Sequence, residues 1–174
     1  MNAFILDTNP IKAAQMHCDE HMKQAVEAAQ MAATALMRHT MLTDTMPFRV
    51  DGKTRYSGKA HPHHPCTRWA GDSRANYEWM VKYGIAVCYQ HTLRYGTQHG
   101  CLDALIHLSK YSHHIPDGEL TPFAQAMPQE LKGDDPVKAY RAYYNTKMFK
   151  NDKRPSWTHG VPAPVWWQDM EVKV

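Results

Sequence analysis

Two histidines four residues apart are the first chemically suggestive feature of this sequence. His17 and His21 lie in the run His-Cys-Asp-Glu-His, and a carboxylate, Glu27, follows about two helical turns later. Side chains four positions apart share one face of a helix, so the pair could contact a ligand, carry a proton or chelate a metal ion. The default interpretation is two polar-face histidines that hydrogen-bond to their neighbours.

A second cluster of potential ligands lies between residues 61 and 68. It consists of His61, His63, His64, Cys66 and Arg68, and prolines interrupt it. Four nitrogen and sulfur ligands within six residues are compatible with a metal site. A loop that binds phosphate ahead of a helix N-terminus uses these residues at least as well, and a solvated loop is the default.

A third feature is the basic segment at residues 138–154, in which Asp152 is the single acid. Its basic residues are Lys138, Arg141, Lys147, Lys150, Lys153 and Arg154, and its rings are Tyr140, Tyr143, Tyr144 and Phe149, with Trp157 just beyond. Cations neutralise phosphates and rings stack on unpaired bases, so the segment predicts salt-dependent DNA binding. The alternative is an amphipathic helix with tyrosines in the core and lysines in solvent.

Composition and missing motifs narrow the classes of function. The formal charge of +3 is too small to predict nucleic-acid binding by itself, and no apolar run is long enough for a membrane span. The start of the chain does not look like a secretory signal, so a cytoplasmic protein with four reduced cysteines is expected. No P-loop, Gly-x-Gly-x-x-Gly, Gly-x-Ser-x-Gly or His-Glu-x-x-His motif occurs, and we predict neither a metal nor an organic cofactor.

The elements that must position these residues are helical. Asn9-Pro10 supplies an N-cap and an N1 proline, and apolar residues then recur at helical spacing from Ile11 to Leu36 without Gly or Pro. This pattern predicts one long helix that ends near Arg38. Residues 40–65 contain five Gly or Pro residues and predict a long surface loop.

Three more helices are predicted after the loop. The second runs from Cys66 or Ser73 to Tyr95, ahead of a glycine at position 96, and the third covers roughly residues 98–111. Asp135-Pro136 opens a fourth helix over roughly residues 136–149, and the Trp- and Pro-rich tail is expected to pack across the helices. The sequence therefore predicts an all-α fold: one compact domain over residues 1–174, with about four helices and a long Pro/His-rich loop.

Separated segments of the sequence also match, in the same order, motifs of a known protein family. MHCDEHMKQAVEAA, residues 16–29, is similar to an Asp-x-His segment that leads into a catalytic glutamate, with Glu27 nearest to that glutamate. In the middle helix, Tyr77, Cys88, Arg94 and Gly96 match a helix that begins at an aromatic residue and ends at a basic residue before glycine. MPQELKGDDP, residues 127–136, is similar to Ile-Pro-Gln-Glu-Phe-Arg-Gly-Asp, and KRPSW, residues 153–157, to Gln-Arg-Pro-Thr-Trp. Together these segments resemble the phage pyrimidine-dimer DNA glycosylases, and also uncharacterised phage proteins.

The resemblance implies a small all-α enzyme that removes a damaged or modified base from DNA. It implies that the base is flipped out of the stack and that Glu27 or Asp19 activates water or stabilises the sugar cation, while His21 and His17 orient the substrate or carry protons. DNA is the expected partner. The expected nucleic-acid contacts are His64, Arg68, Arg94, Lys147, Lys150, Lys153, Arg154 and Trp157.

One position departs from the family's pattern. The family uses the α-amine of a threonine that is exposed by methionine removal, whereas residue 2 here is Asn2, which usually leaves Met1 attached. We therefore expect base removal by carboxylate-assisted attack of water, without an imine. Two alternatives stay open: a non-catalytic module that binds nucleic acid or a host protein, and a metal-dependent enzyme that uses the histidines.

Overall fold

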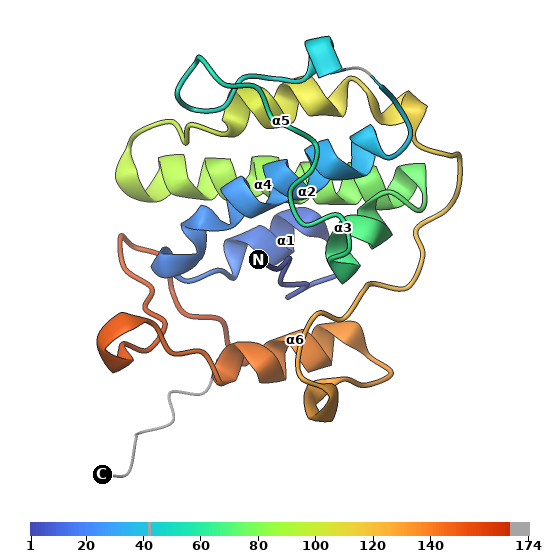
Figure 1. The fold of residues 1–174 in the computed structure, drawn as a ribbon. Helices are drawn as coiled ribbons and strands as arrows, with labels where there is room; N and C mark the ends of the chain where they lie inside the picture. Colours follow the sequence, from blue (N-terminus) through green and yellow to red (C-terminus); the bar gives the residue numbers. More distant parts are fainter. Residues whose placement is uncertain (42, 168–174) are drawn as a thin grey trace.

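The computed structural model describes residues 1–41 and 43–167, and this part of the chain is all-α (Figure 1). Its α-helices are α1 (Pro10–Gln15), α2 (Gln24–Met37), α3 (Pro65–Ala70), α4 (Arg74–Tyr95), α5 (Leu102–Ser109) and α6 (Pro136–Asn145). Short 3-10 turns lie between them: η1 (Asp19–Lys23), η2 (Thr43–Thr45), η3 (Ser112–His114), η4 (Gln129–Leu131) and η5 (Lys150–Asp152). In the described ranges, β-type pairing is limited to an isolated bridge between Phe48 and Arg55. The predicted fold class is confirmed.

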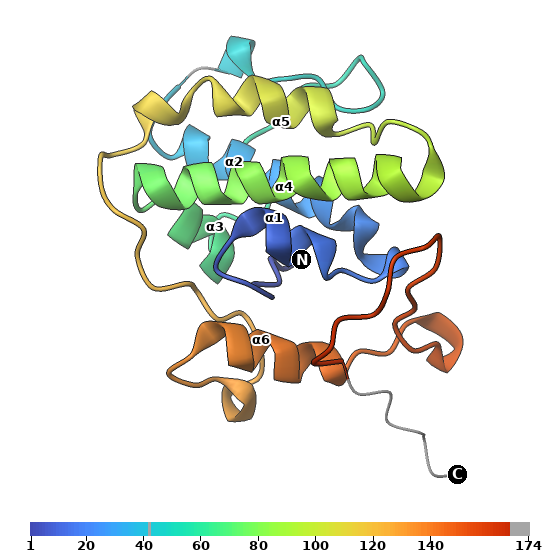
Figure 2. The same cartoon turned by 180° about the vertical axis from the view of Figure 1, so that it is seen from behind.

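Helix α4 lies at the centre of the fold. Helices α1, α2, α3 and α5 all pack on it, and Figure 2 shows it crossing the shorter helices. Gly84 permits this close packing, because a Cβ there would lie 2.8 Å from Leu105 Cδ2 on α5 and 2.9 Å from Ala28 Cβ on α2. Helix α4 therefore acts as the support on which the candidate residues of the other helices are positioned.

The N-terminal segment lies between these helices and α6. Residues 3–6 are all buried, and the Arg141 side chain on α6 donates a hydrogen bond to Leu6 O at 2.9 Å. In Figure 1, α6 lies below the other helices and the N-terminus lies between the two layers. The first residues of the chain thus join α6 to the rest of the core.

The prediction of one long first helix is wrong, because the chain breaks between α1 and α2. Cys18 is extended, with φ −69° and ψ 168°, and the 3-10 turn η1 follows it. The backbone groups at the break have tertiary partners: Arg94 donates to His17 O at 2.8 Å, and Asp19 N donates to Ser156 O at 2.9 Å. The apolar periodicity continues through the break because α1 and α2 both pack on α4.

The other predicted helices exist, with changed bounds. The second helix is two helices, α3 and α4, and Ser73 caps α4 by accepting a hydrogen bond from Asn76 N at 3.2 Å. Helix α4 ends at Gly96, which has a left-handed φ of +70°, as the sequence predicted. Helices α5 and α6 are shorter than predicted, and Asp135 caps α6 through Val137 N at 2.9 Å.

Residues 40–41 and 43–64 are irregular apart from η2 and the isolated bridge, which agrees with the predicted loop, and Pro65 begins α3. The tail also packs as predicted, since Trp157 Nε1 donates to Met16 O at 3.1 Å. The described residues do not include residue 42, which belongs to the predicted loop, or residues 168–174 at the end of the predicted domain. No helix in the described ranges is long and apolar enough to cross a membrane.

Candidate functional site

Glu27 and the start of the chain form the centre of the candidate site. Glu27 lies in the first turn of α2, and its Oε2 accepts a hydrogen bond from the main-chain nitrogen of Asn2 at 2.6 Å. The amino group of Met1 lies 3.9 Å from the same oxygen. The Asn2 side chain is buried and donates to Ala126 O at 2.7 Å, which fixes the chain start against the carboxylate.

A cavity of about 310 Å³, which we call the N-terminal cavity, opens beside this carboxylate. Its walls come from the chain start, from η1 and α2, and from the end of α6 and the residues after it. They include Met1, Asn2, Phe4, His21, Lys23, Gln24, Glu27, Ala126, Tyr143, Lys147, Met148 and Phe149. The Met1 amino group, Lys23 and Lys147 bring three cations to the cavity against one carboxylate. Such a cavity favours an anionic ligand.

Lys147 is held over aromatic rings at this cavity. Its Nζ lies 3.7 Å from the centre of the Tyr143 ring and 5.1 Å from that of Phe4. The ring faces attract the ammonium group, so the aromatic rings, rather than a carboxylate, hold Lys147 in place on the cavity wall. Its charge is consequently available to a phosphate.

His21 contributes a neutral imidazole to the cavity wall. Burial, followed by the charges of Lys23 and Lys147, lowers its pKa to about 3. Its ring stacks on Phe4 at 4.8 Å and meets Phe149 edge-on at 5.2 Å between centroids. A neutral ring of this kind can exchange a hydrogen bond with a ligand but supplies no positive charge near pH 7.

His17 lies deeper and belongs to a buried hydrogen-bond network. The Tyr144 hydroxyl lies 2.7 Å from His21 Nδ1 and 3.3 Å from His17 Nδ1, and it accepts from Cys18 N at 2.9 Å. On its other side, His17 Nε2 lies 2.6 Å from the Tyr83 hydroxyl. Burial, followed by the charges of His21 and Arg94, holds the pKa of His17 well below its usual value. His17 is therefore a hydrogen-bonded core histidine, whereas the default interpretation of the sequence placed it on a polar helix face.

We expect Tyr144→Phe to lower the free energy of unfolding by about 2 kcal/mol, because it leaves the buried N–H of Cys18 without an acceptor and removes the hydrogen-bond partner of His21 Nδ1. Tyr143→Phe on the same helix is the matched control, since that ring is half-buried. Urea unfolding of both variants measures the difference. Equal stability of the two variants would contradict this role of the Tyr144 hydroxyl.

Asp19 and Arg94 form an ion pair with each other, and neither residue lines the N-terminal cavity. Arg94 Nη1 lies 2.8 Å from Asp19 Oδ1, and the two side chains are 0% and 11% exposed. The other Asp19 oxygen accepts from Thr158 N at 2.9 Å. The catalytic role expected for Asp19 and the phosphate contact expected for Arg94 thus fall on an ion pair between a buried arginine and a partly buried aspartate, which holds the helix break and the tail together.

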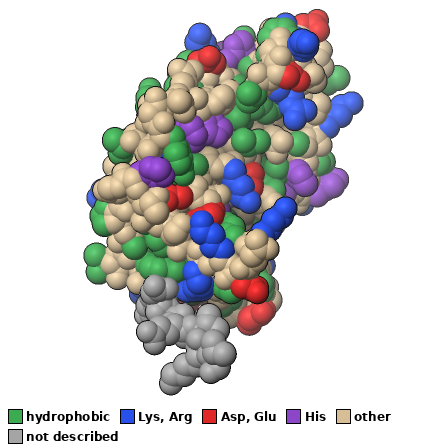
Figure 3. Space-filling model, turned by 90° about the vertical axis from the view of Figure 1, so that its left-hand side faces the viewer, with side chains coloured by type: hydrophobic (Ala, Val, Ile, Leu, Met, Phe, Trp, Pro, Cys, Tyr) green, Lys and Arg blue, Asp and Glu red, His purple; other side chains and the backbone are tan. Residues whose placement is uncertain are grey.

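Most of the basic segment is also engaged with protein groups. Lys153 forms an ion pair with Glu20 at 2.7 Å, and Arg154 donates to Asn145 O at 2.8 Å while its guanidinium lies 4.7 Å from the Trp167 ring. Burial alone would raise the pKa of Glu20, but hydrogen bonds from Lys153 and Ser156 outweigh burial and lower that pKa to about 2. Lys150 is exposed in η5. In Figure 3, Lys and Arg side chains are interspersed with Asp and Glu rather than gathered into one basic band. Of this segment's cations, Lys147 alone lines the N-terminal cavity.

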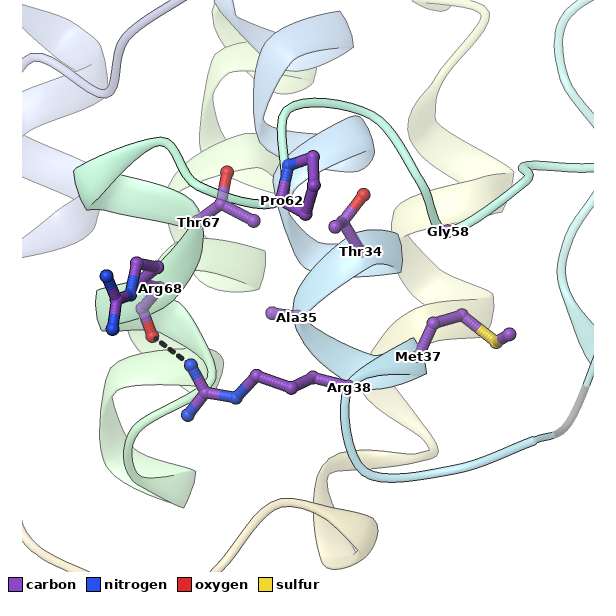
Figure 4. A pocket seen from close by; sticks show the side chains of 8 residues that line it. All are labelled: Thr34, Ala35, Met37, Arg38, Gly58, Pro62, Thr67 and Arg68. Atoms are coloured by element: carbon purple, nitrogen blue, oxygen red, sulfur yellow. Dashed lines mark hydrogen bonds between the residues drawn. The ribbon is translucent and has the colours of Figure 1, made fainter.

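The cluster at residues 61–68 is divided between two places. His64 caps α3 by accepting from Cys66 N at 3.2 Å, and burial, followed by the N-terminal amino group, lowers its pKa. Arg68 lies at a separate cavity of about 170 Å³, where Arg38 donates to Arg68 O at 3.1 Å. Figure 4 shows the Arg68 guanidinium extending away from the other side chains of that cavity. Cys66 is buried, and within the described ranges no three His, Cys, Asp or Glu side chains form a group that could hold a metal ion.

Comparisons with protein-family models, curated proteins and solved structures found no match to this chain. The functional proposal therefore rests on the N-terminal cavity together with the sequence resemblance. Of the residues at this cavity, the sequence pointed to Glu27, His21, Lys147 and the Phe149 ring but gave no signal for Gln24. The apolar residues 3–6 were the sequence signal for the position of this cavity. A buried segment directly after Asn2 places the start of the chain against the core.

Proposed function

We propose that this protein processes DNA by cleaving the N-glycosidic bond of a damaged or modified base, as its resemblance to the pyrimidine-dimer DNA glycosylases implies. The observation that carries the proposal is the Glu27 carboxylate, which lies on the wall of a cavity with three cations. The cations suit a DNA phosphate, and the carboxylate suits the positive charge that develops on the sugar when the base departs.

The chemistry assigned to Glu27 follows from its neighbours. A base inside a duplex cannot reach a protein cavity, so the target nucleotide must be flipped out. Glu27 then orients a water molecule towards the sugar C1′ or stabilises the oxocarbenium-like sugar, while Lys147 holds a phosphate. The released base carries the electron pair of the broken bond and takes up a proton, which the neutral His21 ring relays from solvent.

One observation favours the rival function, a non-catalytic DNA- or protein-binding module. Glu27 already accepts a hydrogen bond from the Asn2 amide, so the carboxylate has a structural task as well. In that case DNA binding is retained and base release is absent.

The experiment combines base release with binding. Ultraviolet-irradiated and deaminated duplexes are incubated with the parent protein and with Lys147→Gln, and Lys110→Gln serves as the control because Lys110 is an exposed lysine at the end of α5, outside the 138–154 segment. We expect base release by the parent, DNA binding about tenfold weaker for Lys147→Gln with a smaller salt dependence, and no change for the control. Binding without release of any base supports the non-catalytic DNA-binding module. An absence of DNA binding contradicts DNA processing and leaves the protein-binding module as the remaining function.

Borohydride added during the reaction separates the two chemical routes. An attack by the Met1 amine would form an imine at C1′, and the reductant would then join the protein to DNA covalently. We expect no covalent complex, because the proposed nucleophile is water. A complex that maps to Met1 would assign the nucleophile to the amine instead, which lies 3.9 Å from Glu27.

A further inference from the structure

An amide side chain with an unpaired oxygen lies on the wall of the N-terminal cavity. Gln24 begins α2 and is only 2% exposed, yet its Oε1 has no hydrogen-bond partner among the described residues. A buried carbonyl without a partner costs about 1–3 kcal/mol, so such groups are uncommon unless a ligand completes them. Gln24 is therefore a candidate for ligand recognition.

The surroundings of Gln24 indicate what kind of ligand completes it. Lys23 and Lys147 supply positive charge at the same cavity, and Phe149 supplies an aromatic ring. At about 310 Å³, the cavity is at the lower end of the range for small-molecule sites, which suits one nucleotide. An amide pairs with the edge of a nucleobase by accepting one N–H and donating to the neighbouring acceptor.

We propose that Gln24 reads the edge of a single flipped base in the N-terminal cavity, with its Oε1 accepting an N–H of that base. The terminal torsion of glutamine is broad, so rotation about it can present Oε1 to a ligand in the cavity. This inference rests on the proposed function and names the recognition element that the cavity would use. Glu27 and Lys147 then act on the sugar and phosphate, and Gln24 acts on the base.

The test measures binding of isolated nucleotides to the full chain. Calorimetry gives the Kd of the four deoxynucleoside 5′-monophosphates and of deoxyribose 5-phosphate, which has the same anion but no base. Three proteins are compared: the parent, Gln24→Leu and Gln24→Glu. For the parent, we expect tighter binding of the nucleotides than of deoxyribose phosphate.

Gln24→Leu should weaken each nucleotide about tenfold, the effect of one lost hydrogen bond to the base, and should change deoxyribose phosphate less than about twofold. Gln24→Glu can only accept hydrogen bonds, so it should shift the ranking towards the guanine nucleotide, which offers two adjacent N–H donors. Thermal unfolding completes the comparison: Gln24→Leu should be at least as stable as the parent, because it removes an unpaired buried carbonyl.

Nucleotide affinities that stay within about twofold in both variants would overturn the role of Gln24 and leave the proposed function intact. A marked loss of stability in Gln24→Leu would also overturn it, because the amide would then serve the fold. If the parent binds none of the five ligands and releases no base from DNA, the proposed function fails together with this inference.

Discussion

Glu27→Gln is expected to reduce the rate of base release by at least about a hundredfold while the fold stays intact. General acid–base assistance by a positioned side chain contributes about 10²–10⁴-fold to a rate, and glutamine cannot supply the negative charge. Its amide oxygen can still accept the hydrogen bond from Asn2 N that the carboxylate accepts now at 2.6 Å. The substitution therefore separates the chemical task of Glu27 from its structural task.

Single-turnover release rates and thermal unfolding check this expectation, and Glu130→Gln, at an exposed carboxylate of η4, is the matched control. Asp19→Asn gives a second comparison, because Asp19 pairs with the buried Arg94 side chain. That variant should lose stability, and any loss of rate should follow the loss of folded protein. Full activity of both Glu27→Gln and Asp19→Asn would show that the catalytic site does not include these two residues.

Acidification from pH 7 to pH 5 is expected to destabilise the protein strongly. The pKa of His21 is about 3 in the folded protein, chiefly because of burial, whereas an unfolded histidine has a pKa of about 6.5. Between these values the unfolded chain binds more protons, so stability falls as the pH falls below about 6.5. At pH 5 the loss from His21 is about 2 kcal/mol, and His17, whose pKa is also lowered by burial, adds to it in the same direction.

Urea unfolding at pH 7, 6 and 5 measures this loss. His21→Asn should show a smaller dependence on pH, and His113→Asn, which alters an exposed ring of η3, should keep the dependence of the parent. Glu20 does not interfere, because its lowered pKa of about 2 places its own loss of stability below about pH 4.5. A stability that stays constant from pH 7 to pH 5 would contradict the burial of neutral histidines.

Local signals in the sequence were sufficient for the fold class and for several helix ends. Asn9, Ser73 and Asp135 each accept a main-chain N–H at a helix start, and Gly96 adopts the left-handed conformation after α4. The break at Cys18 could not be predicted from such signals. The groups that satisfy its backbone, Arg94 and Ser156, are distant in sequence, and the apolar pattern continues through the break.

The candidate site could be predicted only in part, for a related reason. Residue type and spacing drew attention to Glu27 and His21, but the resemblance to the glycosylases also gave a catalytic role to Asp19 and a phosphate contact to Arg94. Opposite charges satisfy each other when both are buried, and that pairing depends on tertiary contacts that spacing does not contain. Gln24 was not identified because a glutamine in an apolar helix has no chemical signature until a cavity and an unpaired oxygen accompany it.

On the ribosome, the first residues of this chain emerge long before their partners. Phe4 packs against Tyr140, Tyr143 and Tyr144 of α6, so we expect residues 3–6 to stay unpacked until α6 has left the exit tunnel. The N-terminal cavity includes both Met1 and Phe149, and a nascent chain that ends before Phe149 lacks part of its wall. The apolar start of the chain is consequently the segment that a chaperone would need to shield during synthesis.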